Sequence, residues 1–143
     1  MRPALLDASI YITALRTGDD ATLSLRNFAS SSPIWLSAVV LQELYAGTLR
    51  SDIHIMERLE RDFEAVRRVL VPNIRDWTRT GRILSRMAEK YGHQEIGKKR
   101  LIGDALIATS AGRLGITVIT ANERDFSKLA EFDPFDWRVL KLS

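Results

Sequence analysis

Four acidic residues in this sequence lie at a predicted helix start or on an apolar face of a predicted helix. They are Asp7, Glu43, Asp104 and Asp125. Glu43 is the clearest case, because the residues three and four positions away, which would share its side of a helix, are all small or apolar. A carboxylate on an apolar face is costly to bury unless something neutralises its charge. The four acids are therefore candidates for binding a cation.

Three of these acids also have an ordinary structural explanation, which the sequence leaves open. Asp7 could cap a helix that starts directly after it, although Ser9 would serve equally well. Asp104 could be an acid favoured near a helix N-terminus and paired with Arg100. Glu43 could face outward at the edge of a helix face that is only partly buried.

For Asp125 the structural explanation is the stronger one. Asp125 lies three residues after Asn122, and at this spacing each side chain can satisfy a backbone amide at the start of a helix. Thr120, however, ends an apolar run that is typical of a strand. The segment therefore opens where α/β proteins bind their ligands.

Short apolar runs alternate with longer segments of helical periodicity. The predicted strands span residues 4–6, 34–36, 69–71, 116–120 and 137–140. The predicted helices span residues 9–15, 20–29, 38–49, 53–68, 77–91 and 101–114. This alternation predicts an α/β fold, a three-layer α/β/α sandwich around a mostly parallel sheet.

The candidate acids are placed to meet at one edge of such a sheet. The chain leaves all parallel strands at the same edge, and ligands bind there near the point where the strand order reverses. Asp7 and Asp125 follow two predicted strands, whereas Glu43 and Asp104 lie on crossover helices. If the first and fourth strands are neighbours, the four carboxylates share a cleft and repel one another unless a divalent cation lies among them.

The composition narrows the choice of cation. The chain has no cysteine, and its two histidines, His54 and His93, are far apart and expected at the surface. Oxygen ligands alone suit Mg²⁺ or Mn²⁺ better than zinc. The corresponding chemistry is metal-assisted hydrolysis of phosphodiesters.

Length and composition also limit the class of protein. With 143 residues the chain is expected to form a single domain, residues 1–143, with 45% hydrophobic residues for its core. The absence of cysteine excludes a disulfide framework and fits a reducing cytosol. The apolar run that follows Pro3 is too short for a signal peptide or a membrane span, so we expect a soluble, cytoplasmic protein.

The net charge of +3 is unevenly distributed along the chain. Residues 50–100 include 13 basic and 8 acidic residues, and the remainder is slightly acidic. This distribution suits a protein that attracts a polyanion at one face and cations at another. A solvated surface with an excess of arginine explains it equally well.

Four segments resemble the acidic motifs of PIN domains, in the order in which that family has them. They are LLDAS at 5–9, QEL at 42–44, GDALIA at 103–108 and TANERDF at 120–126. No single motif is very specific, but the four together, at family-like spacing, extend over essentially the whole chain. The length is typical of the VapC-type toxins, the ribonuclease partners in bacterial toxin–antitoxin pairs.

The resemblance implies a parallel five-stranded sheet in the order 3-2-1-4-5, a homodimer, and an acidic cleft that holds one or two Mg²⁺ or Mn²⁺ ions. By the motif match the four acids would bind the metal, and Ser9, Thr120 and Asn122 would be supporting polar residues. The last acidic position varies within the family. Because Glu123 lies close to Asp125, either residue could supply the fourth acid.

The activity that the resemblance implies is endoribonuclease cleavage, in which metal-activated water attacks an RNA phosphodiester and leaves a 5′ phosphate. The carboxylates would hold the metal without acting as covalent nucleophiles. A small antitoxin would occupy the cleft. Basic residues could guide the RNA, although a solvated helix face is the simpler explanation for each of them. They are Arg50, Arg79, Arg82, Arg86, Lys98, Lys99 and Arg100.

Two other functions fit part of the pattern. A receiver-like domain also gathers acids and Mg²⁺ at strand ends, but it needs paired acids after the first strand and an acceptor aspartate at the end of the third. Here a single Asp7 follows the first predicted strand, and Pro72 and Asn73 follow the third. A non-cleaving PIN-like module that binds RNA or a protein partner is the second alternative, and the intact acids argue against it.

Overall fold

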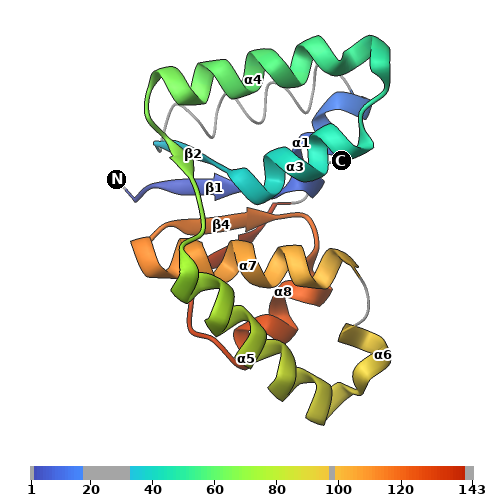
Figure 1. Cartoon of the computed structure of the whole chain (residues 1–143), viewed down its shortest axis with the longest axis vertical. Coiled ribbons are helices and arrows are strands. Elements are labelled where there is room, and N and C mark those ends of the chain that lie inside the picture. The colour runs from blue at the N-terminus through green and yellow to red at the C-terminus, as the bar shows by residue number, and fades with distance from the viewer. Residues whose placement is uncertain (1, 18–32, 97–98, 141–143) are drawn as a thin grey trace.

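The computed structural model describes residues 2–17, 33–96 and 99–140 (Figure 1). All five strands join one sheet, in which every neighbouring pair is parallel and the order is β3-β2-β1-β4-β5. The strands are β1 (Ala4–Leu6), β2 (Ile34–Ser37), β3 (Val69–Leu70), β4 (Thr117–Thr120) and β5 (Trp137–Val139). The predicted strand order is confirmed, and the sheet is parallel throughout rather than mostly parallel.

Seven α-helices fall within the described residues. They are α1 (Ala8–Thr17), α3 (Ala38–Gly47), α4 (Ile53–Ala65), α5 (Ile74–Tyr91), α6 (His93–Ile96), α7 (Lys99–Leu114) and α8 (Glu123–Ala130). A short 3₁₀ turn, Arg50–Asp52, precedes α4. The helix predicted for residues 20–29 lies outside the described residues. Helices α6 and α8 were not among the predicted helical segments, although the capping pattern at Asn122 indicated a helix start.

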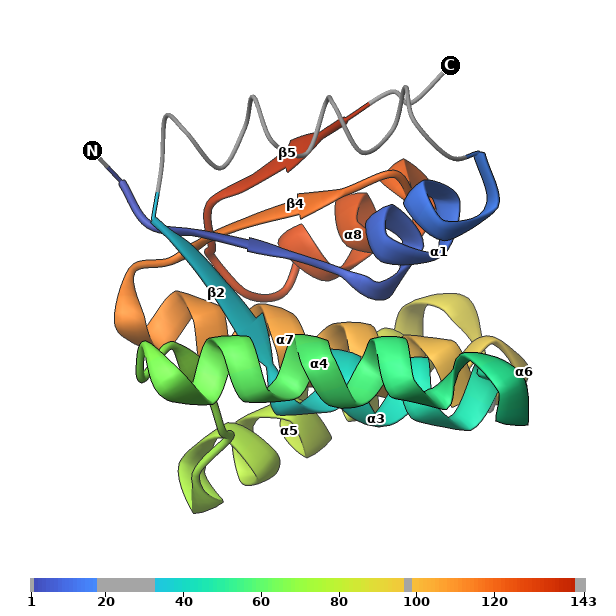
Figure 2. The same ribbon diagram turned by 90° about the horizontal axis from the view of Figure 1, so that it is seen from above.

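The strands bury side chains on both faces of the sheet, as the short apolar runs predicted. Leu5 and Val118 belong to the large core that includes residues of α3, α5, α7 and α8. Leu6 and Ile119, one position further along the same strands, belong to a second cluster with Ile10 of α1. This alternation follows from the two-residue period of a strand. Helices therefore lie on both sides of the sheet (Figure 2).

Helix α5 begins three residues before the predicted position, because a capping box sets its start. The Asn73 side chain accepts a hydrogen bond from the Asp76 backbone N–H at 2.9 Å, and the Asp76 carboxylate accepts one from the Asn73 N–H at 2.9 Å. Asp76 is buried, and it also binds Arg113 of α7 through contacts of 2.9–3.0 Å. One residue thus starts α5 and attaches it to α7.

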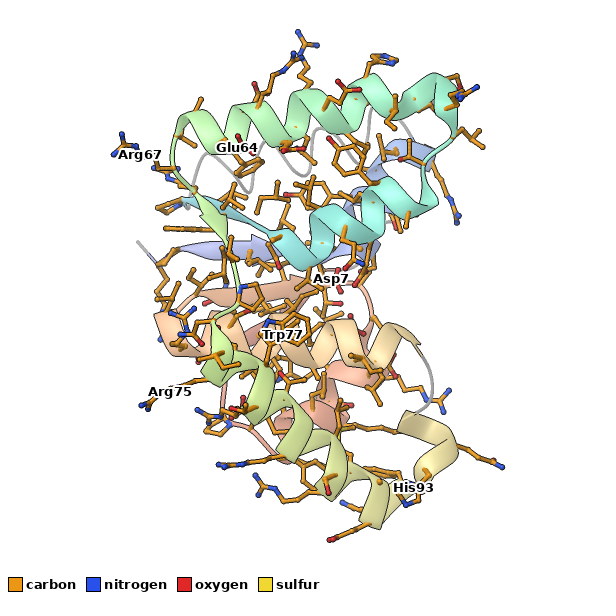
Figure 3. The ribbon with its side chains drawn as sticks, in the orientation of Figure 1. Asp7, Glu64, Arg67, Arg75, Trp77 and His93 are labelled. Carbon is orange, nitrogen blue, oxygen red and sulfur yellow. The ribbon has the colours of Figure 1, made fainter. Side chains whose placement is uncertain are left out.

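Helices α4 and α7 end with the same backbone motif, in which one of the first two residues after the helix has a positive φ. After α4, Arg67 has φ 56°, and its N–H bonds to Glu64 while the next N–H bonds to Phe63. After α7, Gly115 has φ 68° and the same two hydrogen bonds recur. Helix α4 therefore ends at Ala65 and not at Arg68, since this motif reverses the chain (Figure 3).

None of the helices among the described residues is both long and apolar enough to cross a membrane.

Candidate active site

Asp7 occupies the junction between β1 and α1, at the carboxyl end of a central strand (Figure 3). The parallel register pairs Leu6 with Ile119, so Asp7 comes to lie beside Thr120, the last residue of β4. The Asp7 residue is only 3% exposed. The first and fourth strands are neighbours, which was the condition for the predicted convergence of acids.

Both oxygens of the Asp7 carboxylate accept hydrogen bonds. Ser9 Oγ donates to Oδ1 at 2.5 Å, and Thr120 Oγ1 donates to Oδ2 at 2.6 Å. The backbone N–H of Ile10 also points to Oδ1, at 3.4 Å. This last contact is that of an N-cap residue. Asp7 therefore caps α1, while Ser9, the alternative cap, orients the Asp7 carboxylate instead.

Burial raises the pKa of Asp7 above its usual value, and the hydrogen bonds from Ser9 and Thr120 only partly oppose that rise. A buried carboxylate of this kind binds a proton more readily than an exposed one. A divalent cation beside the same oxygens would have the opposite effect, because it stabilises the ionised form. The environment of Asp7 therefore favours a bound positive charge.

The loop after β4 connects Asp7 to Asp125. Thr120 Oγ1 accepts a hydrogen bond from the Asn122 N–H at 2.8 Å while it donates to Asp7. Asn122 in turn donates from Nδ2 to Asp125 Oδ2 at 2.9 Å and accepts from the Asp125 N–H at 3.5 Å. The predicted capping of α8 is correct for Asn122. Asp125, however, contacts the side chain of Asn122 rather than its backbone, because Thr120 already accepts from that N–H.

Glu43 and Asp104 approach the same region from α3 and α7. Asp104 is 4% exposed, on the second turn of α7, and Glu43 is half-buried. Glu43 Oε1 lies so close to Gly103 that it would collide with a Cβ atom there. The Glu43 carboxylate thus contacts the residue that precedes Asp104, across the packed interface of the two helices.

Asp104 lies level with the carboxyl end of β4. Helix α7 runs alongside β4, and a short turn connects its end to the start of that strand (Figure 1). The ten residues from Asp104 to Leu114 correspond to about 15 Å of helix, and the four residues of β4 to about 13 Å of strand. Asp104 is therefore at the edge of the sheet where Asp7 and Thr120 lie.

The predicted acids form two groups at this edge. Hydrogen bonds join Asp7 to Asp125 through Thr120 and Asn122, and a close contact joins Glu43 to the backbone beside Asp104. Among the described residues, no three acidic or histidine side chains lie close enough together to enclose one cation. The oxygen-only donors still fit Mg²⁺, which is commonly held by one or two carboxylates together with water and substrate phosphates.

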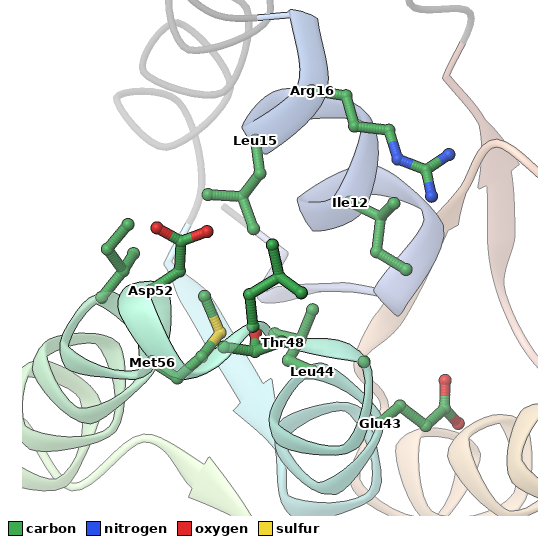
Figure 4. Close-up of a pocket in the computed structure, with 11 residues that line it drawn as sticks. Ile12, Leu15, Arg16, Glu43, Leu44, Thr48, Asp52 and Met56 are labelled. Carbon is green, nitrogen blue, oxygen red and sulfur yellow. The ribbon is translucent and has the colours of Figure 1, made fainter.

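A pocket of about 470 Å³ adjoins Glu43 and is bounded by α1, α3 and the start of α4 (Figure 4). Much of its wall is apolar, from Ile12, Leu15, Leu44, Ile55 and Met56. Three charged residues also line it, namely Arg16, Glu43 and Asp52. An apolar hollow of this size could receive side chains of another molecule next to the acidic edge.

The basic residues predicted to guide RNA differ in their surroundings. Arg79 forms an ion pair with the buried Asp133 and so has a structural role on α5. Arg50, Arg82 and Arg86 are exposed. Lys98 lies outside the described residues, and for Lys99 and Arg100 the structure describes the backbone alone. These three exposed arginines therefore remain candidates for contact with RNA.

Gly103 is the site residue that the sequence reasoning missed. Its signal was a glycine inside a helical segment, with no turn or helix end to explain it. Such a glycine lowers helix stability relative to alanine, so its presence indicates a close approach by another group. In this fold that group is the Glu43 carboxylate.

Comparison with known proteins agrees with this architecture. The chain resembles the VapBC complex from Salmonella typhimurium bound to DNA, with a TM-score of 0.69 and 22% identity over 97% of this chain and 98% of that one. It also resembles VapBC2 from Rickettsia felis bound to a promoter DNA fragment, with a TM-score of 0.69 and 19% identity over 97% and 99% of the two chains. For VapBC-1 from nontypeable Haemophilus influenzae, the TM-score is 0.66 and the identity 21%, over 96% and 97%.

A comparison with curated protein sequences found no match. The sequence model of the PIN domain matches residues 4–132, which include all four predicted acids and their supporting polar residues. The chain therefore belongs to the PIN domain family.

Proposed function

We propose that this PIN-domain protein is an endoribonuclease that depends on Mg²⁺ or Mn²⁺ and acts as the toxin of a VapC-type toxin–antitoxin pair. The observation that carries the proposal is the environment of Asp7. Its carboxylate is buried at the carboxyl end of a central strand, and two hydroxyl groups hold it in place. An acid kept in such an environment, with further acids at the same edge, is characteristic of a site that binds a cation.

The acids and the hydroxyl groups would have different roles in such a site. Asp7 and Asp104, both buried, would provide the fixed ligands, with Glu43 and Asp125 at the margins. Ser9 and Thr120 orient Asp7, as hydroxyl groups around a metal ligand commonly do. A bound Mg²⁺ or Mn²⁺ would activate water for attack on the RNA phosphodiester and neutralise charge at phosphorus.

The partners follow from the same proposal. The structural neighbours are VapBC complexes, so we infer that a small antitoxin protein binds this chain as well. The pocket beside Glu43 has an apolar wall with two acids, Glu43 and Asp52, and one cation, Arg16, which a partner with apolar and charged side chains would fit. We also expect a homodimer, for which Ile74 and Trp77, exposed and one helical turn apart on α5, are a candidate contact. A toxin of this kind would act on RNA in the cytoplasm.

Cleavage of RNA by the purified chain tests the activity. We expect a labelled structured RNA to be cut in Mg²⁺ or Mn²⁺, and EDTA to stop the reaction. Asp104→Asn should abolish cutting, because the amide cannot provide the negative charge that a hard cation requires. Asp136→Asn is the matched control. Asp136 is exposed and lies at the amino end of β5, whereas the candidate acids lie at the carboxyl ends of the strands.

Full cleavage in EDTA, or by the folded Asp104→Asn variant, would contradict the proposed metal site. RNA that binds to the wild-type chain and is never cut would instead support the alternative, a PIN-like module that binds RNA or protein without cleavage.

The oligomeric state is tested separately by light scattering, where Trp77→Ala should weaken a dimer formed through α5. A wild-type chain that remains monomeric at high concentration excludes the homodimer.

A further inference from the structure

Helices α3 and α7 pack against each other, and Gly103 of α7 lies against Val39 and Glu43 of α3. A Cβ atom built on Gly103 would collide with Glu43 Oε1 and would lie 3.6 Å from Val39 Cγ1. Val39 and Glu43 are four residues apart on α3, so both lie on the side of α3 that faces α7. The Glu43 carboxylate consequently occupies the space that a side chain at position 103 would need.

Backbone conformation does not explain the glycine. Gly103 lies inside α7 and has no positive φ, whereas Gly92 and Gly115 do. Among the described glycines, Gly103 alone would place a Cβ closer than 3.0 Å to another atom. Glycine in a helix interior is less favourable than alanine. The space for the Glu43 carboxylate is the remaining reason for glycine at this position.

We propose that Gly103 is a positioning residue, whose missing side chain lets the Glu43 carboxylate lie against α7 beside Asp104. This inference rests on the proposed metal-dependent function, because the purpose of the contact is to bring a second carboxylate to Asp104. The inference assigns a role to Gly103 itself, in addition to the roles proposed for the acids. In a protein that needed only helix packing here, alanine would be preferred.

The substitution Gly103→Ala separates this role from folding. The atom that the new methyl group meets is the end of a flexible side chain, so Glu43 can turn away without movement of the helix backbone. The Val39 contact of 3.6 Å is an ordinary van der Waals distance. Gly103→Ala should therefore fold with an unchanged or raised melting temperature, while its Glu43 carboxylate is displaced from its position against α7.

Calorimetric titration of the purified chain with Mn²⁺ measures the consequence. We expect Gly103→Ala to weaken Mn²⁺ binding by about 10-fold, the lower range for loss of a group that orients a metal ligand. The matched control is Gly112→Ala on the same helix, where the new Cβ would make contacts of only 3.4 Å and 3.7 Å, with Phe135 and Pro134. Gly112→Ala should bind Mn²⁺ like the wild type.

A double-mutant cycle shows whether Gly103 acts through Glu43. Glu43→Gln should weaken Mn²⁺ binding by itself, and Gly103→Ala should add nothing further in the Glu43→Gln background. A folded Gly103→Ala variant that binds Mn²⁺ as tightly as the wild type overturns the inference, and so do additive effects in the cycle. A wild-type chain that binds no Mn²⁺ overturns the proposed metal-dependent function itself, which is a different result.

Discussion

The hydroxyl of Thr120 donates a hydrogen bond of 2.6 Å to Asp7 Oδ2, across 113 residues of chain. Strand β4 thereby orients the carboxylate that follows β1, and the same hydroxyl accepts from the Asn122 N–H. Parallel pairing of the two strands makes this contact possible, because it brings their carboxyl ends together. The position of Asp7 is therefore determined by both strands, and this leads to the first prediction.

Thr120→Val should raise the pKa of Asp7 further. The Thr120 hydrogen bond is one of the groups that lower this pKa, whereas burial, the larger influence, raises it and remains. If ionised Asp7 binds the metal, the acid limb of the pH–rate profile for RNA cleavage should move to higher pH. Thr117→Val on the same strand is the control and should leave the limb in place. An unshifted limb for a folded Thr120→Val variant contradicts the role given to the hydroxyl.

The stability of Asp7→Asn relative to the wild type should rise with pH in the presence of EDTA, while the substitution removes activity. Burial raises the folded-state pKa of Asp7 above its usual value, so between these two values the folded state binds more protons than the unfolded state. Stability therefore falls as the pH rises through that window, by about 1.4 kcal/mol for each pKa unit of difference. Asparagine has the same shape and no charge to lose. Its amide nitrogen replaces one of the two oxygens that accept hydrogen bonds, which lowers stability by an amount that does not depend on pH.

Urea denaturation from pH 4 to pH 7 measures this effect. The free energy of unfolding of Asp7→Asn minus that of the wild type should increase with pH. Addition of Mg²⁺ at neutral pH should stabilise the wild type and leave Asp7→Asn unchanged. A difference that stays constant from pH 4 to pH 7 would show that the buried charge carries no penalty in the folded chain.

The sequence was sufficient to predict the sheet because its signals are local. The strands are short apolar runs that end at polar or turn-forming residues. Parallel pairing places the carboxyl ends of the strands at one edge of the sheet, whatever the conformation of the loops. The prediction that Asp7, Glu43 and Asp104 lie at that edge depended on the same reasoning and on nothing finer. The family resemblance then supplied the strand order.

Side-chain contacts between distant segments could not be predicted in this way. Nothing in the sequence near Glu43 indicates that its carboxylate lies against Gly103, because that contact depends on how α3 packs on α7. The ion pair of Arg79 with Asp133 is a further example, 54 residues apart. The sequence around Arg79 gives no sign of this ion pair, because the partner is visible only in the fold.

Asp76→Ala should destabilise the chain by about 3 kcal/mol, the lower range for breaking a buried ion pair, since Arg113 retains partial exposure. The carboxylate of Asp76 is buried and binds both Arg113 and the Asn73 N–H, so its removal breaks the ion pair and one of the two hydrogen bonds of the capping box. Chemical denaturation measures the loss. Asp136→Ala breaks the exposed ion pair with Arg2 and should change stability by less than about 1 kcal/mol.

The Mn²⁺ affinity of folded Asp76→Ala should equal that of the wild type. Asp76 starts α5, away from the edge where Asp7 and Asp104 lie, and its role is to hold helices together. Equal stability of the Asp76→Ala and Asp136→Ala variants would show that the buried pair contributes no more than the exposed one. A changed Mn²⁺ affinity would show that the packing of α5 on α7 affects the acidic edge.

Arg67→Gly should stabilise the chain by about 1 kcal/mol. Arg67 has φ 56° at the end of α4, a conformation that costs a residue with a Cβ about 1–2 kcal/mol and glycine almost nothing. Because the unfolded state of a glycine variant is more flexible, part of this gain is lost. The side chain of Arg67 extends away from the body of the molecule, so its removal should break few contacts (Figure 3).

Gly115, at the corresponding position after α7, provides the reverse experiment. It has φ 68° and the same two backbone hydrogen bonds, so Gly115→Ala should destabilise by an amount similar to the gain in Arg67→Gly. No atom lies within 4 Å of a Cβ at Gly115, which means that backbone conformation alone accounts for the change. Urea denaturation of both variants should therefore give shifts of opposite sign, and shifts of the same sign would refute the shared helix-end motif as their cause.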